Sequence, residues 1–359
     1  MSRIHNFSAG PAVLPLPVLQ QASRDILEVQ GTGLGILECS HRSAMFDEVI
    51  GGAISRLRSL LNLDDDQEVL FLHGGARTQF YQWPMNVLGG GRAAYLDTGN
   101  WARFAAEDAA RYGQVDTLFS SQDTGYDRVP EQGSISVPSD ALYLHYTSNN
   151  TVAGTQFDYV PDPGKSWLAC DMSSDFLSRP VDGSKFDYLY AGAQKNVGPS
   201  GTTVVILRRR VLERCSEDLP RMLQYPVQVS KSSMLNTPCT FSIYVVSLVT
   251  KWIEERGGLG AIDAHNRAQA GKVYGAIDGS GFYSGKVSVG SRSLMNITFT
   301  TGDADLDTAF WKTAADEGIS GLKGHRSVGG LRASIYNAQT DEAIDALVGF
   351  MAEFERRRG

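Results

Sequence analysis

Ala191-Gly-Ala-Gln-Lys-Asn-Val-Gly-Pro-Ser-Gly201 joins an apolar run, a lysine and a turn of glycine, proline and serine. Most lysines are solvated surface charges. Lys195, however, follows an apolar strand and lies between glycines that let the backbone approach another group closely. A lysine held in such a site can lose its proton and attack an aldehyde, as in a Schiff base with a cofactor. Lys195 is therefore the first candidate catalytic residue.

The segments around this stretch predict an α/β fold. Short apolar runs occupy residues 68–72, 93–97, 141–146, 167–171, 186–191 and 203–207, and segments long enough for crossover helices separate most of them. This pattern is typical of a mainly parallel sheet with helices on both faces. Only residues 192–202 separate the last two runs, so we expect an antiparallel strand there.

The chain is long enough for two domains. An apolar helix over residues 244–255 is followed by Gly257-Gly258, which is typical of a helix end. We expect a large domain over 16–257 and a smaller one over 1–15 and 258–359. The second part predicts helices at 261–277 and 304–317, strands at 286–289, 295–299 and 331–335, and a last helix that starts near Thr340.

Composition excludes several classes of protein. The formal net charge is −7 and no basic stretch is long enough to predict nucleic-acid binding. No apolar run reaches the length of a membrane helix, and the start lacks the pattern of a signal peptide. The four cysteines, Cys39, Cys170, Cys215 and Cys239, are too widely spaced for a zinc site or a disulfide scaffold. We therefore expect no metal, no membrane partner and a reducing, cytoplasmic setting.

Asp171 ends the run at 167–171, and a carboxylate at the end of a parallel strand points into the crevice where α/β sheets bind ligands. Pyridoxal phosphate needs an acid against its ring nitrogen so that the ring acts as an electron sink. A turn or helix-cap aspartate is common at such a position. Its place 24 residues before Lys195 favours the cofactor interpretation.

Further candidates follow other strands. In His73-Gly-Gly-Ala-Arg-Thr-Gln79, the amides of Ala76 and Arg77 could cradle a phosphate at a helix start, although a plain Gly-Gly turn has the same pattern. Trp101 could stack on a flat cofactor ring or belong to the core. Thr151 could donate a hydrogen bond to the cofactor's phenolic oxygen or cap a turn.

Arginines would recognise an acidic substrate. His41-Arg42, which follows a strand-like run at 35–39, and His325-Arg326 are His-Arg pairs suited to a phosphate or a distal carboxylate. Arg332 suits an α-carboxylate through bidentate geometry. Surface salt bridges would explain the same residues. The glycines around Arg326 favour a ligand-binding loop.

Taken together, these motifs make the chain resemble the phosphoserine aminotransferases, class V members of the fold-type I pyridoxal-phosphate enzymes. The resemblance runs nearly end to end. It rests on Asn6-Phe-Ser-Ala-Gly-Pro-Ala12, Ser40-His-Arg42, His73-Gly-Gly-Ala-Arg77, Leu177-Ser-Arg-Pro180, Ala191–Gly201, Asn236-Thr-Pro238, residues 324–337 and the closing Phe354-Glu-Arg-Arg-Arg358. One departure is Ala76, where many relatives have glycine. A left-handed backbone would be costly there.

The resemblance implies a large domain with a mainly parallel seven-stranded sheet between helices and a smaller α+β C-terminal domain. It implies that Lys195 carries pyridoxal phosphate, that Asp171 pairs with its ring nitrogen, and that Trp101 and Thr151 contact its ring. Ala76, Arg77 and Gln194 would hold the phosphate, completed by Asn236 and Thr237 of the partner in a homodimer with shared sites. The substrate would contact Ser8, His41, Arg42, His325, Arg326 and Arg332.

The implied activity is exchange of an amino group between phosphoserine and 2-oxoglutarate in serine biosynthesis, with Lys195 moving the proton. Phosphohydroxythreonine, a substrate for pyridoxine biosynthesis, stays open. A cysteine desulfurase of the same fold is an alternative, although Cys39 and Cys239 look poorly placed for it. A nicotinamide-dependent enzyme would need a G-x-G-x-x-G motif that His73-Gly-Gly-Ala-Arg lacks. A silent phosphate-binding protein would not need Lys195 and Asp171.

Overall fold

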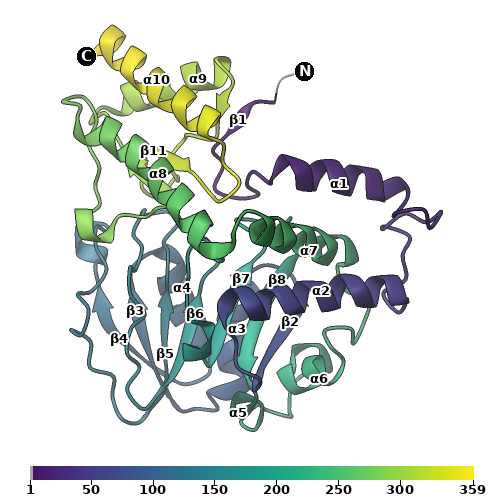
Figure 1. The fold of residues 1–359 in the computed structure, drawn as a ribbon. Helices are drawn as coiled ribbons and strands as arrows, with labels where there is room; N and C mark the ends of the chain where they lie inside the picture. Colours follow the sequence, from purple (N-terminus) through teal and green to yellow (C-terminus); the bar gives the residue numbers. More distant parts are fainter. Residues whose placement is uncertain (1–2) are drawn as a thin grey trace.

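A sheet of seven strands organises the chain, whose residues 3–359 are described by a computed structural model (Figure 1). The strand order is β2-β8-β7-β6-β5-β3-β4. The strands are β2 (Gln67–His73), β3 (Arg92–Asp97), β4 (Gln114–Ser120), β5 (Ala141–Thr147), β6 (Trp167–Asp171), β7 (Tyr188–Gly192) and β8 (Thr202–Arg208). Neighbours from β4 to β7 are parallel, whereas β8 is antiparallel to both β7 and β2. The predicted parallel sheet and its antiparallel strand are confirmed.

Helices cover both faces of this sheet, as predicted. Side chains of α2 (Ala44–Leu61) and α7 (Thr240–Glu255) pack on one face. Those of α3 (Arg77–Val87), α4 (Asn100–Ala109) and α6 (Tyr225–Ser230) pack on the other. Each face therefore has its own hydrophobic core, and burial on both faces explains why the central strands are almost entirely apolar.

Shorter elements complete this part of the chain. They are α1 (Leu16–Leu27), α5 (Arg209–Leu212) and the 3-10 turns η1 (Gln122–Thr124), η2 (Gly183–Lys185) and η3 (Arg221–Leu223). Within residues 3–359, no helix is long and apolar enough to cross a membrane.

The C-terminal part lies over one end of the sheet (Figure 1) and has its own core. Its elements are α8 (Gly258–Asp278), η4 (Val289–Ser291), β9 (Asn296–Phe299), α9 (Ala304–Asp316), β10 (Ile319–Ser320), β11 (Leu331–Ser334) and α10 (Asp341–Arg358). β9 and β11 are antiparallel, and the N-terminal strand β1 (His5–Asn6) pairs with β10. Phe7 belongs to this core. The two-domain division stays a prediction, which the separate core and the place of Phe7 support.

The last helix forms as its sequence predicts. Thr340 is the N-cap, and its hydroxyl accepts a hydrogen bond of 3.2 Å from the amide of Ala343. Such a cap satisfies one of the amides that have no partner inside the helix. Ile344, Leu347 and Met351 are buried on one face, so the cap and the apolar periodicity together fix where α10 begins and which side it buries.

Two predicted strands are wrong. Residues 286–289 form no strand, and the next residues form the single turn η4. The strand-like run at 35–39 is a turn. In each case an apolar side chain that suggested burial is exposed: Val289 by 77% and Leu37 by 56%. An apolar run becomes a strand only where a neighbouring strand and a core are available.

Candidate active site

Lys195 lies in the turn that follows β7, at the carboxyl end of the parallel strands. Its Nζ atom donates a hydrogen bond of 2.7 Å to Oγ1 of Thr151. Burial lowers the pKa of Lys195 to about 8, opposed by the negative charge of Asp171 and reinforced by the positive charge of Arg332. A lysine with such a pKa is partly neutral near pH 8, and a neutral amine is a nucleophile and a base.

Asp171 is the last residue of β6 and is buried. One carboxylate oxygen, Oδ1, accepts hydrogen bonds from the amide of Ser173 at 2.9 Å and from its hydroxyl at 2.6 Å. Burial raises the pKa of Asp171, whereas the charge of Lys195 and the bonds from Ser173 lower it. The hydroxyl of Ser173 also accepts a bond of 3.1 Å from the amide of Gly192, which ties the acid to the strand that leads to Lys195.

Our sequence interpretation did not include Ser173. A serine two residues after an aspartate often donates to that carboxylate in a local turn, so the Asp-Met-Ser spacing carried the signal.

The predicted phosphate cradle lies at the start of α3. Ala76 is the N-cap residue, with φ −51° and ψ −30°. The strain that we anticipated for alanine at this position is therefore absent. Within residues 3–359 no hydrogen bond uses the amides of Ala76 or Arg77. Two free amides at a helix N-terminus form an anion-binding site.

Gln194 lies close to the same cradle. A Cβ atom on Gly192 would lie 2.7 Å from Oε1 of Gln194 and 3.3 Å from the amide nitrogen of Ala76. The glycine therefore lets these two groups approach each other. Oε1 of Gln194 is buried and has no hydrogen-bond partner among the described residues. Because Oε1 can only accept, the side-chain NH2 of Gln194 is the group that could donate to an anion at the cradle.

Trp101 lies in the first turn of α4 and packs edge-on against Phe104, with ring centroids 5.9 Å apart. The guanidinium of Arg77 lies over the other ring of this pair, 5.3 Å from the centroid of Phe104. Phe104 therefore brings Trp101 to the phosphate cradle. The neighbouring Asn100 donates a hydrogen bond of 3.1 Å to the hydroxyl of Ser327, in the loop that carries His325 and Arg326.

Arg332, on β11, reaches the same region from the C-terminal part. Its Nη1 atom donates to the carbonyl of Thr151 at 3.2 Å, and its Nε atom is buried without a partner among the described residues. Burial lowers the pKa of Arg332. The pKa of His325 is also lowered, by burial and then by the positive charges of Arg332 and Arg326. Arg332 and His325 therefore face one positively charged space beside Thr151.

The remaining predicted residues are only partly brought together. Ser8 lies two residues before Gly10, where an added Cβ would be 3.3 Å from Cγ of Lys195. The other four predicted residues are His41, Arg42, Asn236 and Thr237. Within residues 3–359, no hydrogen bond or ion pair joins any of them to Lys195, Asp171 or Thr151. The carbonyl of Thr237 instead contacts Nε2 of His73 at 3.0 Å.

The cysteines considered for a desulfurase are held in place. Cys39 is buried, and its sulfur lies 3.2 Å from the hydroxyl of Ser43. The thiol of Cys239 donates to the carbonyl of Gly201 at 3.3 Å. A desulfurase needs a mobile, reactive thiol beside Lys195, and neither of these thiols has that environment.

Comparison with known proteins agrees with this geometry. The family model described as Aminotransferase class-V matches residues 4–347. A phosphoserine aminotransferase of Desulfatibacillum aliphaticivorans is 50% identical over 100% of this chain and 99% of its own length. One of Azotobacter vinelandii is 49% identical over 99% of both chains.

Solved structures give the same result. A phosphoserine aminotransferase from Bacillus circulans subsp. alkalophilus has a TM-score of 0.97 at 49% identity and covers 99% of both chains. One from Trichomonas vaginalis, solved with bound PLP, has a TM-score of 0.92 at 38% identity and covers 98% of this chain and all of its own. The chain therefore belongs to the class V aminotransferases and, among them, to the phosphoserine aminotransferase family.

Proposed function

We propose that this chain is a pyridoxal-phosphate-dependent enzyme that exchanges an amino group between O-phospho-L-serine and 2-oxoglutarate. The reaction is reversible and has two stages, in which each substrate leaves as product before the next one binds. Biosynthetic flux runs towards phosphoserine, from 3-phosphohydroxypyruvate and glutamate. The observation that carries the proposal is the 2.7 Å contact between the low-pKa amine of Lys195 and Thr151, across from the buried carboxylate of Asp171. The names of the 48–50% identical relatives support the substrates.

The residues present fit the cofactor. The free amides of Ala76 and Arg77 and the side-chain NH2 of Gln194 would hold its phosphate by donating hydrogen bonds to it. Asp171 would hold the ring nitrogen of the cofactor, Thr151 its phenolic oxygen, and Trp101 one face of the ring. When bound, pyridoxal phosphate supplies an aldehyde that condenses with amines and a protonated ring that accepts electrons.

Lys195 then acts through its Nζ atom. In its neutral form the amine would remove the proton from the α-carbon of the amino-acid substrate, and as an ammonium it would return a proton to the C4′ carbon of the cofactor. Ser173 and Lys195 favour the ionised form of Asp171 and oppose the rise in its pKa that burial causes. An ionised Asp171 would supply the negative charge that favours a protonated ring. Both tasks require a dry site, which the burial of Asp171 and Thr151 supports.

Arginines select the acidic substrate. Arg332 has an unpaired Nε atom and one Nη atom on the carbonyl of Thr151, so its fork has free donors for the α-carboxylate. His325 and Arg326 lie on the loop beside it and would receive the substrate's phosphate or the distal carboxylate of glutamate. Ser8 would contact the amino acid from the other side.

We further propose a homodimer with shared active sites. Large apolar side chains are exposed around the end of α1 and the loop after it, among them Leu27 at 81% and Leu37 at 56%. This segment projects from one side of the molecule (Figure 1), and a second copy would cover it. Asn236 and Thr237 are exposed and would complete the partner's phosphate site, while His41 and Arg42 would reach substrate across the interface.

A reducing, cytoplasmic compartment is also proposed. All four cysteines are free, and Cys39 and Cys170 are buried as thiols. Thiols that form no disulfide are usual in a reducing compartment.

Activity measurements test the function. The purified protein should form glutamate from glutamate-free mixtures of phosphoserine and 2-oxoglutarate, and plain serine should be a poor donor. Lys195→Ala should abolish turnover, a fall of about 10⁴-fold or more, while Lys165→Ala, at an exposed lysine, should leave it unchanged. Near-normal turnover in Lys195→Ala would contradict the assignment. Phosphohydroxythreonine assayed in parallel decides whether it is a second substrate.

Complementation tests the shared sites. Lys195→Ala and Asn236→Ala, each of low activity alone, are unfolded together and refolded as a mixture. In a mixed dimer one site carries both changes and the other carries neither, so about a quarter of all sites should be intact. No recovery above the separate proteins would contradict shared sites.

A further inference from the structure

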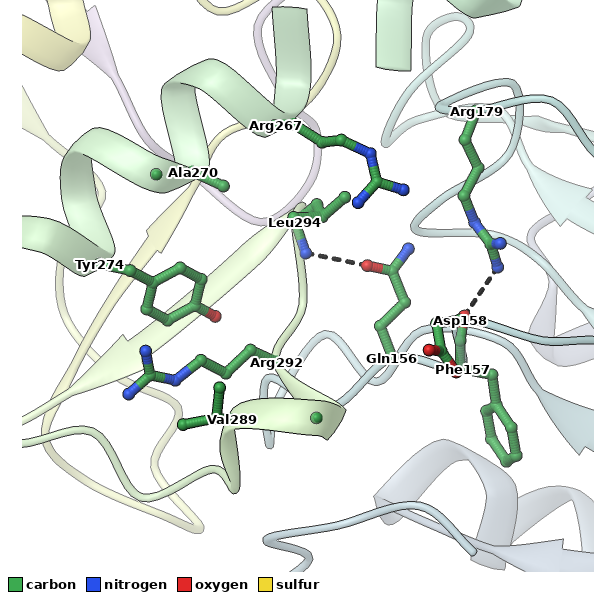
Figure 2. Close-up of a pocket in the computed structure, with 12 residues that line it drawn as sticks. Gln156, Phe157, Asp158, Arg179, Arg267, Ala270, Tyr274, Val289, Arg292 and Leu294 are labelled. Atoms are coloured by element: carbon green, nitrogen blue, oxygen red, sulfur yellow. Dashed lines mark hydrogen bonds between the residues drawn. The ribbon is translucent and has the colours of Figure 1, made fainter. Parts of the chain in front are cut away.

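A pocket of about 420 Å³ lies between the sheet-containing part and the C-terminal part of the chain, apart from Lys195 (Figure 2). Gln156, Phe157 and Arg179 line it from the first part, and Arg267, Tyr274 and Arg292 from the second. Neither Lys195 nor Asp171 is among its lining residues. Arg179 belongs to the Leu177-Ser-Arg-Pro180 motif, which has no role in the proposed reaction.

Three guanidinium groups give this pocket a positive character. Arg179 donates one bond of 2.7 Å to the carbonyl of Phe157, and its Nε atom is buried without a partner among the described residues. Arg267 uses its Nε atom on Asp263 at 2.9 Å, and within residues 3–359 neither of its terminal nitrogens has a hydrogen-bond partner. Figure 2 shows the guanidinium of Arg267 directed towards Arg179 across the pocket.

The third arginine is paired with a carboxylate through both terminal nitrogens, although its Nε atom has no partner among the described residues. Arg292 binds Asp278 through both terminal nitrogens, at 2.6 and 2.7 Å, and lies over the ring of Tyr274 at 4.6 Å. It therefore forms a wall of the pocket, while Arg179 and Arg267 keep free donors. The carboxylate in the lining is Asp158, which is exposed to solvent.

The amide of Gln156 lies between the two arginines in Figure 2 but supplies no acceptor to them. Its oxygen accepts from the amide of Leu294 at 2.9 Å, and its nitrogen donates to buried Asp175 at 3.0 Å. Arg179 also lies 4.0 Å from buried Asp175, and Arg267 pairs with Asp263, so each guanidinium already has a carboxylate on one side. The Nε atom of Arg179 and the terminal nitrogens of Arg267 have no hydrogen-bond partner among the described residues, and a bound oxyanion would accept from them.

The other walls are apolar. Phe157, Ala270, Tyr274 and Leu294 contribute to them, and Val289 stands at the edge with 77% of its surface exposed. A ligand that covered Val289 and Tyr274 would bury apolar surface, which favours binding. The ligand that matches both walls has a negative end and a compact apolar body.

We propose that this pocket is a second binding site, specific for a small organic carboxylate whose carboxylate pairs with Arg179 and Arg267 and whose apolar body lies on Tyr274 and Val289. The occupant contacts both parts of the chain at once, so it restrains their relative motion. The site is independent of the proposed reaction.

Fluorine NMR with 4-fluorobenzoate as the probe tests this site on the cofactor-loaded enzyme. The probe's line should broaden with the wild-type protein. Arg267→Gln should weaken binding at least tenfold, because it removes one of the two charged partners of the probe's carboxylate. Lys272→Gln removes an exposed, ion-paired cation from the same helix outside the pocket and should bind normally. Equal broadening with Arg267→Gln and wild type would overturn the proposal.

Two further arms locate the probe and define its class. Arg332→Gln removes the residue proposed to bind the substrate's α-carboxylate in the catalytic site, and it should leave binding of the probe unchanged. If Arg332→Gln abolished binding of the probe while Arg267→Gln did not weaken it, the probe would lie in the catalytic site and the inference would be overturned. Val289→Ser should weaken 4-fluorobenzoate binding. Inorganic phosphate should compete poorly, and competition as strong as that of unlabelled benzoate would overturn the role of the apolar wall. None of these outcomes depends on which amino acid the enzyme uses.

Discussion

Both the hydroxyl and the amide of Ser173 donate to the same oxygen of Asp171, at 2.6 and 2.9 Å. Hydrogen bonds to a carboxylate favour its ionised form, so Ser173 opposes the rise in the pKa of Asp171 that burial causes. Because both bonds reach Oδ1, the arrangement fixes the direction of the carboxylate. Ser173 is therefore a positioning residue for the acid that would face the cofactor ring.

Ser173→Ala should weaken cofactor binding about tenfold and raise the pKa of Asp171, because a charge-assisted bond worth about 1.5–3 kcal/mol is lost. Titration of the cofactor-free protein with pyridoxal phosphate, repeated from pH 5 to 8, measures both effects. The loss should grow towards low pH, where Asp171 protonates first in the variant. Ser173→Thr keeps the hydroxyl and should restore binding; a Thr variant as weak as Ala would contradict the role of the hydroxyl.

The sequence predicted the central sheet because its strands are buried on both faces. The run at 167–171 matches β6 residue for residue. β4, at the sheet edge, was missed because its residues are only half-buried or exposed and show no apolar run. The runs that contain Val289 and Leu37 were wrongly predicted as strands, because local apolarity does not reveal whether a partner strand exists.

The site was predictable where a motif fixes local geometry. Lys195 and Asp171 lie at the ends of adjacent parallel strands β7 and β6, as sequence position required. The contact of Arg332 with Thr151 joins residues 181 positions apart, and no local pattern encodes such a distance. Arg332 was a candidate because a single arginine fork suits an α-carboxylate, with a surface salt bridge as the alternative. Its role, like those of the other substrate residues, remains a prediction.

The reaction of the cofactor-free protein with pyridoxal phosphate should accelerate with pH, with a midpoint near pH 8. The folded pKa of Lys195 lies at about 8, below its ordinary 10.5, so the neutral amine increases as pH rises through 8. Stopped-flow absorbance at a series of pH values measures the rate. Because its pKa is lower in the folded state, Lys195 reduces the free energy of unfolding below pH 8. This loss of stability declines as the pH rises from about 8 to 10.5. A midpoint near 10.5 would show that Lys195 is not perturbed.

Arg332→Gln should raise the KM for both phosphoserine and glutamate roughly thirtyfold, since about 2 kcal/mol of carboxylate binding is lost. Steady-state kinetics with each substrate measure the change. Arg357→Gln, which alters an exposed arginine of α10 paired with Glu353, is the control and should behave as wild type. An effect confined to phosphoserine would assign Arg332 to the phosphate and contradict its place at the α-carboxylate.

Gly154→Ala should destabilise the fold by about 2–4 kcal/mol. Gly154 has φ +86°, and an added Cβ would lie 2.7 Å from Oγ1 of Thr298 and 2.9 Å from the carbonyl of Asn296. Gly275→Ala, in the last turn of α8 with nothing within 4 Å of an added Cβ, should instead stabilise by about 0.5–1 kcal/mol. Urea unfolding followed by circular dichroism compares them, and equal midpoints would refute the steric account.

The visible absorbance spectrum of the purified protein, before and after phosphoserine alone is added, tests the central claim most directly. We predict a yellow band from the cofactor bound through Lys195. This band should bleach with phosphoserine, persist with plain serine and return with 2-oxoglutarate. A band that phosphoserine leaves unchanged would contradict the proposed substrate. If no band forms even after incubation with pyridoxal phosphate, the proposed roles of Lys195 and the cofactor are wrong.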